Sequence, residues 1–173
     1  PIFLNIPIYI NLVLLYLFTL NAVYLMSPTT QSNLYPFIDH ISIIMILSLF
    51  IGIMGTVPGH ELIHRKKDKF DQLIGNLLLA LSWDCTFAIE HVQGHHKNVG
   101  FINDPATARR GENIYKFVLK AILQEHVDAW RFQLKKLKKY NYSIFSYHNN
   151  ILIGYSLSLT FCFFVYSIGG IYS

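Results

Sequence analysis

Five of the eight histidines fall in two short groups, HELIH at residues 60–64 and EHVQGHH at residues 90–96. Neutral imidazole is a common protein ligand for zinc, copper and iron. One His-x-x-x-His pair arises by chance on many polar helix faces, but five histidines within 37 residues of a mostly apolar chain indicate a metal site. The predicted ligands are His60, His64, His91, His95 and His96.

Helical geometry sorts these ligands into pairs. Residues four apart differ by about 40° in azimuth, so His60 shares a helix face with His64, and His91 shares one with His95. His96 lies about 140° from His91 and joins that face only where the turn is irregular, which a glycine at position 94 permits. The spacing therefore predicts two clamps of imidazoles and one further imidazole.

The spacing leaves the identity of the metal open. HELIH matches the zinc hydrolase pattern His-Glu-x-x-His, in which Glu61 is the general base. One zinc site needs two histidines and one further ligand, which leaves the three histidines of the second group in surplus. A carboxylate-bridged di-iron bundle needs a second Glu-x-x-His, but Gln93 stands at the third position after Glu90. Five imidazoles suit two metal ions with additional ligands.

The composition places these groups in a membrane protein. Hydrophobic residues make up 53% of the 173 residues and charged residues only 14%, against roughly a quarter charged in soluble domains. Long apolar runs predict three spanning helices, at about residues 2–26, 38–58 and 149–172. We predict an all-α fold, a polytopic helical membrane protein that forms a single domain over residues 1–173. A net charge of +4 on such a chain argues against nucleic acid binding.

The basic residues predict the topology, because all 14 lysines and arginines lie between residues 65 and 139. The positive-inside rule places residues 59–140, with the metal site, on the cytoplasmic side. Residues 70–89 are largely apolar but cannot cross once and leave both basic regions inside, so they are predicted to form a re-entrant or interfacial helical segment. Residues 114–140 mix apolar residues with many lysines and resemble an amphipathic helix at the membrane surface.

Three motifs together resemble the membrane alkane 1-monooxygenase family: GHELIHRK at residues 59–66, EHVQGHH at residues 90–96 and DPATARRGE at residues 104–112. They stand in that family's order and at similar spacing, and the resemblance covers about residues 56–137. The related xylene monooxygenases, and more distantly the fatty acyl desaturases, share this histidine-box plan. Arg65 stands where the alkane enzymes usually have lysine. The family's Asn-Tyr…His-Tyr-Gly motif and its last histidine box do not occur here, so this chain is expected to be an incomplete piece that is inactive alone.

The resemblance implies an oxidoreductase with two non-haem iron ions. Such an enzyme uses O₂ to hydroxylate a C–H bond of an apolar hydrocarbon that reaches it through the membrane lipid. A soluble rubredoxin or ferredoxin supplies its electrons, and it is a multi-pass protein of the bacterial inner membrane. A fatty acyl desaturase of the same superfamily is the alternative function. An intramembrane zinc metalloprotease built on residues 60–64 is a more remote alternative.

Four residues near the predicted ligands are candidates for orienting them. Glu61 and Glu90 each neighbour a ligand histidine, and each is expected to accept an N–H from an imidazole or to bind metal directly. Asp104 precedes a proline, which is typical of a helix N-cap. The family resemblance gives Asp104 a second role in orienting the iron-binding loop, with Arg109 as its partner.

Three further residues are singled out on other grounds. Trp83 and Asp84 interrupt the apolar segment 70–89 and are candidates for lining a substrate channel, because a charge among apolar residues is costly unless it is paired or faces water. His126 lies between charged neighbours on the amphipathic segment, so its side chain is expected to be solvated.

Overall fold

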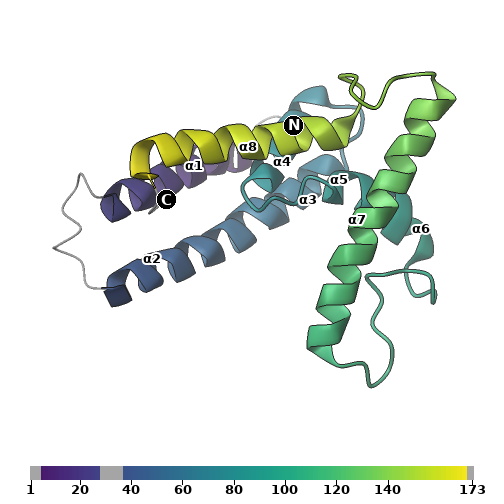
Figure 1. Cartoon of the computed structure of the whole chain (residues 1–173), viewed down its shortest axis with the longest axis horizontal. Helices are drawn as coiled ribbons and strands as arrows, with labels where there is room; N and C mark the ends of the chain where they lie inside the picture. The colour runs from purple at the N-terminus through teal and green to yellow at the C-terminus, as the bar shows by residue number, and fades with distance from the viewer. Residues whose placement is uncertain (1–4, 28–36, 171–173) are drawn as a thin grey trace. The chain divides into compact units, whose positions relative to one another are not determined.

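The computed structural model describes residues 5–27 and 37–170, and within these ranges it is helical without a strand. Figure 1 traces the helices in chain order. The all-α prediction is confirmed. The helices are α1 (Ile6–Met26), α2 (Phe37–Phe50), α3 (Val57–Ile63), α4 (Lys69–Ala80), α5 (Phe87–Glu90), α6 (His96–Asn98), α7 (Ile114–Lys139) and α8 (Asn150–Gly169), with π-helical segments η3 (Ile51–Thr56) and η4 (His91–His95).

Three helices are long and apolar enough to cross a membrane. They are α1, the continuous helix Phe37–Ile63 that α2, η3 and α3 form together, and α8. The three predicted spans are therefore confirmed within the described residues; residues 2–4 and 171–172 of the first and last predicted spans lie outside them. The second span is longer than predicted and carries His60 in its last turn, with His64 directly after it. This chain is a multi-pass membrane protein.

Helix α4 is too short to cross the bilayer. Its 12 residues extend about 18 Å, against about 30 Å for a hydrocarbon core. Asp68 caps its start, because the carboxylate accepts hydrogen bonds from the backbone N–H groups of Phe70 and Asp71. Leu81 ends it, and a turn follows. This agrees with the prediction that residues 70–89 do not make a full crossing.

Two glycines let α4 pack closely on α3. A Cβ added to Gly75 would lie 3.1 Å from the Gly59 carbonyl oxygen and 3.1 Å from Leu62 Cβ. Small residues at a helix contact allow backbones to approach in this way, which is common between membrane helices. The contact matters for the site because Gly59 directly precedes His60.

The chain divides into two compact units, one of residues 1–83 with 156–173 and one of residues 84–155. The first has a core of Leu15, Leu62, Ile74 and Leu78, all nearly or fully buried. The second has a core in which Ile89, Ala129 and Ile151 pack together. Each core therefore holds one histidine group in place: Leu62 lies between His60 and His64, and Ile89 lies two residues before His91.

Candidate metal centre

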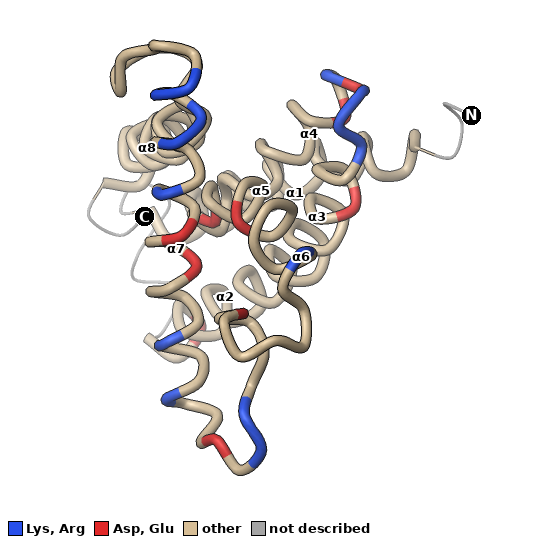
Figure 2. The backbone as a smooth tube through the Cα atoms, turned by 90° about the vertical axis from the view of Figure 1, so that its right-hand side faces the viewer, with Lys and Arg blue, Asp and Glu red and all other residues tan. Residues whose placement is uncertain are grey.

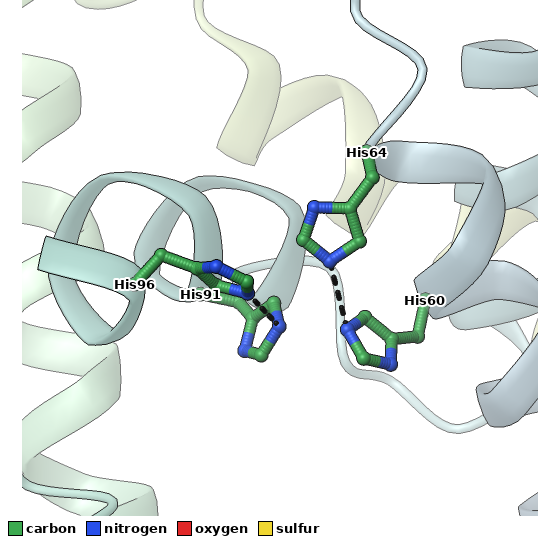
Figure 3. A group of neighbouring side chains, drawn as sticks. All are labelled: His60, His64, His91 and His96. Atoms are coloured by element: carbon green, nitrogen blue, oxygen red, sulfur yellow. Dashed lines mark hydrogen bonds between the residues drawn. The ribbon is translucent and has the colours of Figure 1, made fainter. Parts of the chain in front are cut away.

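The first histidine pair stands at the end of the second span. His60 lies in the last turn of α3 and His64 is its C-cap. Their Nε2 atoms are 2.8 Å apart, and Figure 3 shows the two rings turned toward each other. Leu62, two residues from each histidine, is buried and lies about 160° around the helix from both imidazoles. The predicted clamp of His60 with His64 is present in the structure.

The second pair is formed by His91 and His96, whose Nε2 atoms are 2.9 Å apart (Figure 3). These residues are five positions apart, and the π-helical segment η4 between them makes the approach possible. The His96 backbone N–H donates to the His91 carbonyl, which is the i→i+5 bond of a π-helix. The irregular turn that Gly94 permits is therefore present, but it pairs His91 with His96 through their ring nitrogens, and not with His95 as the four-residue spacing predicted. The His91 and His95 rings stack at 5.2 Å between centroids.

Both pairs have the spacing of two ligands on one metal ion. With metal–nitrogen bonds of about 2.0–2.1 Å, two ligand nitrogens on one ion lie about 2.9 Å apart at a right angle and about 3.3 Å apart at the tetrahedral angle. The observed distances are 2.8 Å and 2.9 Å. Without a cation, two imidazoles keep such a distance only when one ring donates its N–H to the other. Each of these four histidines offers a ring nitrogen as a metal ligand, so the residues fit a histidine-bound metal.

His95 is held by a buried carboxylate. Its Nδ1–H donates to Asp104 Oδ2 at 2.9 Å, and Asp104 is only 3% exposed. Asp104 also accepts from the Thr107 hydroxyl at 2.5 Å and from the Ala106 backbone N–H at 3.1 Å. Burial raises the pKa of Asp104, but these hydrogen bonds and His95 outweigh it, so the pKa lies below its ordinary value. An ionised Asp104 fixes the proton on Nδ1 and leaves the Nε2 lone pair of His95 available for a metal.

Glu90 is enclosed between η4 and α7. It is 3% exposed, and its carboxylate lies where a Cβ on Gly94 would stand, with Phe132 on the far side. Burial, followed by repulsion from Glu125, raises the pKa of Glu90 to about 7. The predicted role of this residue beside His91 remains a prediction.

Glu61 takes part in an ion-pair network on the side of the first pair. Arg65 Nη2 donates to Glu61 at 3.2 Å, and Arg65 Nη1 donates to Asp71 at 3.1 Å and to the Asn5 side chain at 2.7 Å. Asp71 is 2% exposed and also accepts from the Tyr9 hydroxyl at 2.5 Å. The hydrogen bond to Asp71 raises the pKa of Arg65. This network joins α1, α4 and the end of α3 next to His64.

The two channel candidates lie in the turn between α4 and α5. Trp83 is exposed and has a backbone φ of 59°, which is uncommon for a residue other than glycine. Burial raises the pKa of Asp84, and His126 opposes that rise. The role of both residues in a substrate channel remains a prediction.

The prediction of a solvated His126 is wrong. Its Nε2 is hydrogen-bonded to the Tyr155 hydroxyl of α8, and its Nδ1 lies 3.3 Å from the Thr86 hydroxyl. The charged neighbours Glu125 and Asp128 suggested a water-exposed helix face, but residue 126 lies on the side of α7 that packs against the start of α8.

Arg109 lines a polar hollow of about 460 Å³ in the second unit. Its backbone N–H donates to Glu112 at 2.9 Å, whereas Asp104 is held by Thr107, His95 and Ala106. The hollow is lined by loop 98–109 and by α7, which contributes Lys120 and Arg131. Figure 2 shows further lysines and arginines along α7 and in the loop before it.

Sequence reasoning missed three residues that support the site. Thr107 stands within the DPATARRGE motif, three residues after Asp104, and that spacing is the signal that would have found it. Asp71 is a charge at the start of an apolar helix and needed a partner. Tyr9 gives no local signal, because it is 62 positions from the carboxylate to which it donates.

The fold and the site define a class: a multi-pass helical membrane protein in which histidine pairs at helix ends can bind metal. Residues 40–173 match the fatty acid desaturase family. The chain therefore belongs to the fatty acid desaturase family.

Individual relatives show a more specific similarity than the family match. The chain is 35% identical over 116 residues to an alkane 1-monooxygenase 1 of Pseudomonas aeruginosa, covering 67% of this chain and 30% of that protein. It is 40% identical over 112 residues to an alkane 1-monooxygenase of Pseudomonas putida, covering 63% and 28%. It is 32% identical over 162 residues to an alkane 1-monooxygenase of Acinetobacter baylyi, covering 91% and 38%. The chain thus spans about a third of the length of these relatives.

Proposed function

We propose that this chain carries histidine ligands of a non-haem di-iron centre in an integral membrane monooxygenase that hydroxylates a C–H bond of an apolar hydrocarbon. The observation that carries the proposal is the pairing of Nε2 atoms at 2.8 Å in His60–His64 and 2.9 Å in His91–His96. The similarity to proteins named alkane 1-monooxygenase supports iron and a hydrocarbon substrate. Bound iron would supply the activation of O₂, with one oxygen atom entering the alcohol and the other leaving as water after two electrons and two protons are added.

We propose that both histidine pairs and His95 serve one centre on the cytoplasmic side of the bacterial inner membrane. All lysines and arginines lie between residues 65 and 139, which favours one side for both groups. The 12-residue α4, too short to cross, supports the same topology. Asp104 keeps the Nε2 of His95 free by holding its Nδ1–H, and Glu90 and Glu61 border the two pairs.

We propose a soluble rubredoxin or ferredoxin as the electron donor and place its docking surface at the polar hollow. Three cations, Arg109, Lys120 and Arg131, line this hollow against two carboxylates, Asp104 and Asp128, and this excess of positive charge favours an acidic partner. Asp104 lines it as well and contacts His95 directly. A donor bound there would stand one side chain away from a proposed iron ligand.

The family match favours a second candidate, a fatty acyl desaturase that uses the same iron chemistry on an acyl chain. The zinc protease alternative needs Glu61 free to act as a general base toward a metal-bound water. In the structure Glu61 forms an ion pair with Arg65 at 3.2 Å, which opposes that role.

Metal content and product analysis test the proposal on the complete gene product. We expect iron, not zinc, in the detergent-purified protein, and loss of iron in His60→Asn and in His91→Asn. His40→Asn is the matched control, because His40 lies in the second span about 30 Å of helix away from His60 and should leave iron unchanged.

Product analysis in whole cells distinguishes hydroxylation from desaturation. An alcohol formed from a supplied alkane supports hydroxylation. Unsaturated acyl chains without alcohol would favour desaturation, and about one zinc per chain with no iron would exclude both.

A further inference from the structure

Helix α7 carries a stripe of large apolar side chains that the rest of the second unit leaves exposed. Its members are between 40% and 68% exposed, and at 100° per residue they occupy about half of the helix circumference. We call these residues the apolar stripe: Val118, Leu119, Ile122, Leu123, Val127 and Leu134. Along its middle lies a groove of about 630 Å³ whose walls are almost wholly apolar, with Trp130 in one wall.

A row of basic residues follows one edge of the apolar stripe. Lys116, Lys120, Arg131 and Lys138 are separated by 4, 11 and 7 positions, each close to a whole number of helical turns. Lys120 pairs with Glu112 at 2.6 Å and Arg131 with Asp128 at 2.8 Å, yet their side chains remain 45% and 67% exposed. We call these four residues the basic row. Figure 2 shows the basic positions along α7 in blue.

In the same unit, α7 packs against the start of a membrane-spanning helix. Ala129 of α7 packs on Ile151 in the first turn of α8, and Gln133, which is 1% exposed, donates to the His148 carbonyl at 2.8 Å. The His126 side chain is hydrogen-bonded to Tyr155, one turn further along α8. Residues that contact the first turns of a spanning helix lie near the end of that span, which favours a position of α7 at the membrane interface.

We propose that α7 is a binding surface for anionic phospholipid. Acyl chains occupy the groove along the apolar stripe, and headgroup phosphates are held by the basic row. The length and sidedness of the helix fit a lipid surface, because an apolar face bordered by lysine and arginine is the pattern of helices that lie in the interface. The proposal goes beyond the proposed function and is independent of the metal and of the oxygen chemistry, but it shares Lys120 and Arg131 with the surface proposed for the electron donor.

Site-specific fluorescence tests the position of the apolar stripe. An environment-sensitive fluorophore is attached to Leu119→Cys or Leu123→Cys in the complete chain, with Cys85 and Cys162 replaced, in nanodiscs of phosphatidylcholine and phosphatidylglycerol. We expect blue-shifted emission that acyl-chain spin-labelled lipid quenches. Gln124→Cys is the matched control, because Gln124 lines the polar hollow and should be quenched by aqueous iodide instead.

Two results at Leu119 and Leu123 would overturn the proposal. Quenching by iodide would mean that the stripe faces water. Blue-shifted emission that spin-labelled lipid does not quench would mean that protein covers it, either a second copy or another segment of the chain.

Neutralisation of the basic row tests the proposal that it binds headgroup phosphates. Lys116→Gln combined with Lys138→Gln removes two charges from the row, while Lys135→Gln combined with Lys139→Gln removes two charges from the side of the same helix opposite the apolar stripe. Each lysine near an anionic surface changes binding about fivefold. The first double variant should therefore lower the ratio of phosphatidylglycerol to phosphatidylcholine retained by the protein by about 25-fold. The control pair should change it little.

If both double variants lose the same amount of phosphatidylglycerol, the effect is one of general charge, and the proposal that the basic row is a headgroup site is wrong. Unchanged phosphatidylglycerol, together with weakened binding of an acidic ferredoxin, would show that the row docks a protein.

Discussion

His91 and His96 bring their Nε2 atoms to 2.9 Å although they stand five positions apart, because η4 between them is π-helical. In a regular α-helix the two side chains would lie about 140° apart. The bond from the His96 N–H to the His91 carbonyl widens the turn by one residue and returns His96 over His91. The pair therefore depends on the backbone of residues 91–95, and changes that restore a regular helix should separate it.

Gly94→Ala tests this dependence. The added Cβ would overlap Glu90 Oε1 and lie 3.1 Å from Phe132 Cε2, so the buried Glu90 side chain or the turn must move. Overpacking of this kind costs about 1–3 kcal/mol. We expect a lower midpoint of thermal unfolding in detergent and less than half of the iron of the unaltered protein.

Gly52→Ala is the matched control, because Gly52 also lies in a π-helical segment, η3, and its added Cβ meets nothing within 4 Å. If both variants retain iron equally, the close approach of Glu90 to Gly94 does not hold the pair.

The spans and the first pair could be predicted because their signals are local. An apolar run of about 20 residues and a four-residue spacing each fix geometry without knowledge of the rest of the fold. The four-residue spacing predicted His91 paired with His95, and the observed pairing with His96 could not be predicted, since sequence gives no account of where a π-helical turn forms. Glu90, which occupies the space beside Gly94, is the structural reason for glycine there.

Contacts between distant parts of the sequence could not be predicted. Tyr9 donates to Asp71 across 62 positions, and His126 meets Tyr155 across 29. Neither contact follows from periodicity, because each depends on which helix packs beside which. The local charge pattern around His126 even favoured the opposite conclusion, a side chain in water.

Asp104→Asn should weaken metal binding through His95. In the structure both carboxylate oxygens accept hydrogen bonds, Oδ1 from Ala106 and Oδ2 from Thr107 and His95. An amide replaces one acceptor with a donor, so one of these bonds is lost and the tautomer of His95 is no longer fixed. Loss of such a partner typically lowers metal affinity 10–100-fold. Competition with a chelator, followed by iron analysis, measures the change.

Asp128→Asn provides the comparison for that experiment. Asp128 lines the same polar hollow, where its carboxylate pairs with Arg131 at 2.8 Å. Equal loss of iron in both variants would assign the effect to the hollow and not to the bond between Asp104 and His95.

Arg65→Lys should destabilise the first unit. The guanidinium donates to three groups on three segments, Glu61, Asp71 and Asn5, and a single ammonium cannot span them in that geometry. Asp71 is buried and would lose part of its hydrogen bonding, at a cost of about 1–2 kcal/mol for partly exposed charged partners. The midpoint of thermal unfolding in detergent measures this loss of stability. Lys67→Arg, at an exposed position two residues on, should be neutral. An Arg65→Lys protein as stable as the unaltered one would show that the network adds nothing to folding.

Lys67 and Lys97 should lie on the same, cytoplasmic face of the membrane. Both are exposed, and one follows the first histidine group while the other follows the second. A full crossing between them would separate the groups by about 30 Å and exclude a shared metal centre. The 12 residues of α4 are too few for that crossing, and the basic residues on both sides of residues 70–89 oppose it.

Cysteine placed at either position, with Cys85 and Cys162 replaced, should resist an impermeant thiol reagent outside intact cells and react once the cells are opened. Labelling of one position alone from outside would place the two histidine groups on opposite faces, and each pair would then bind metal separately or not at all.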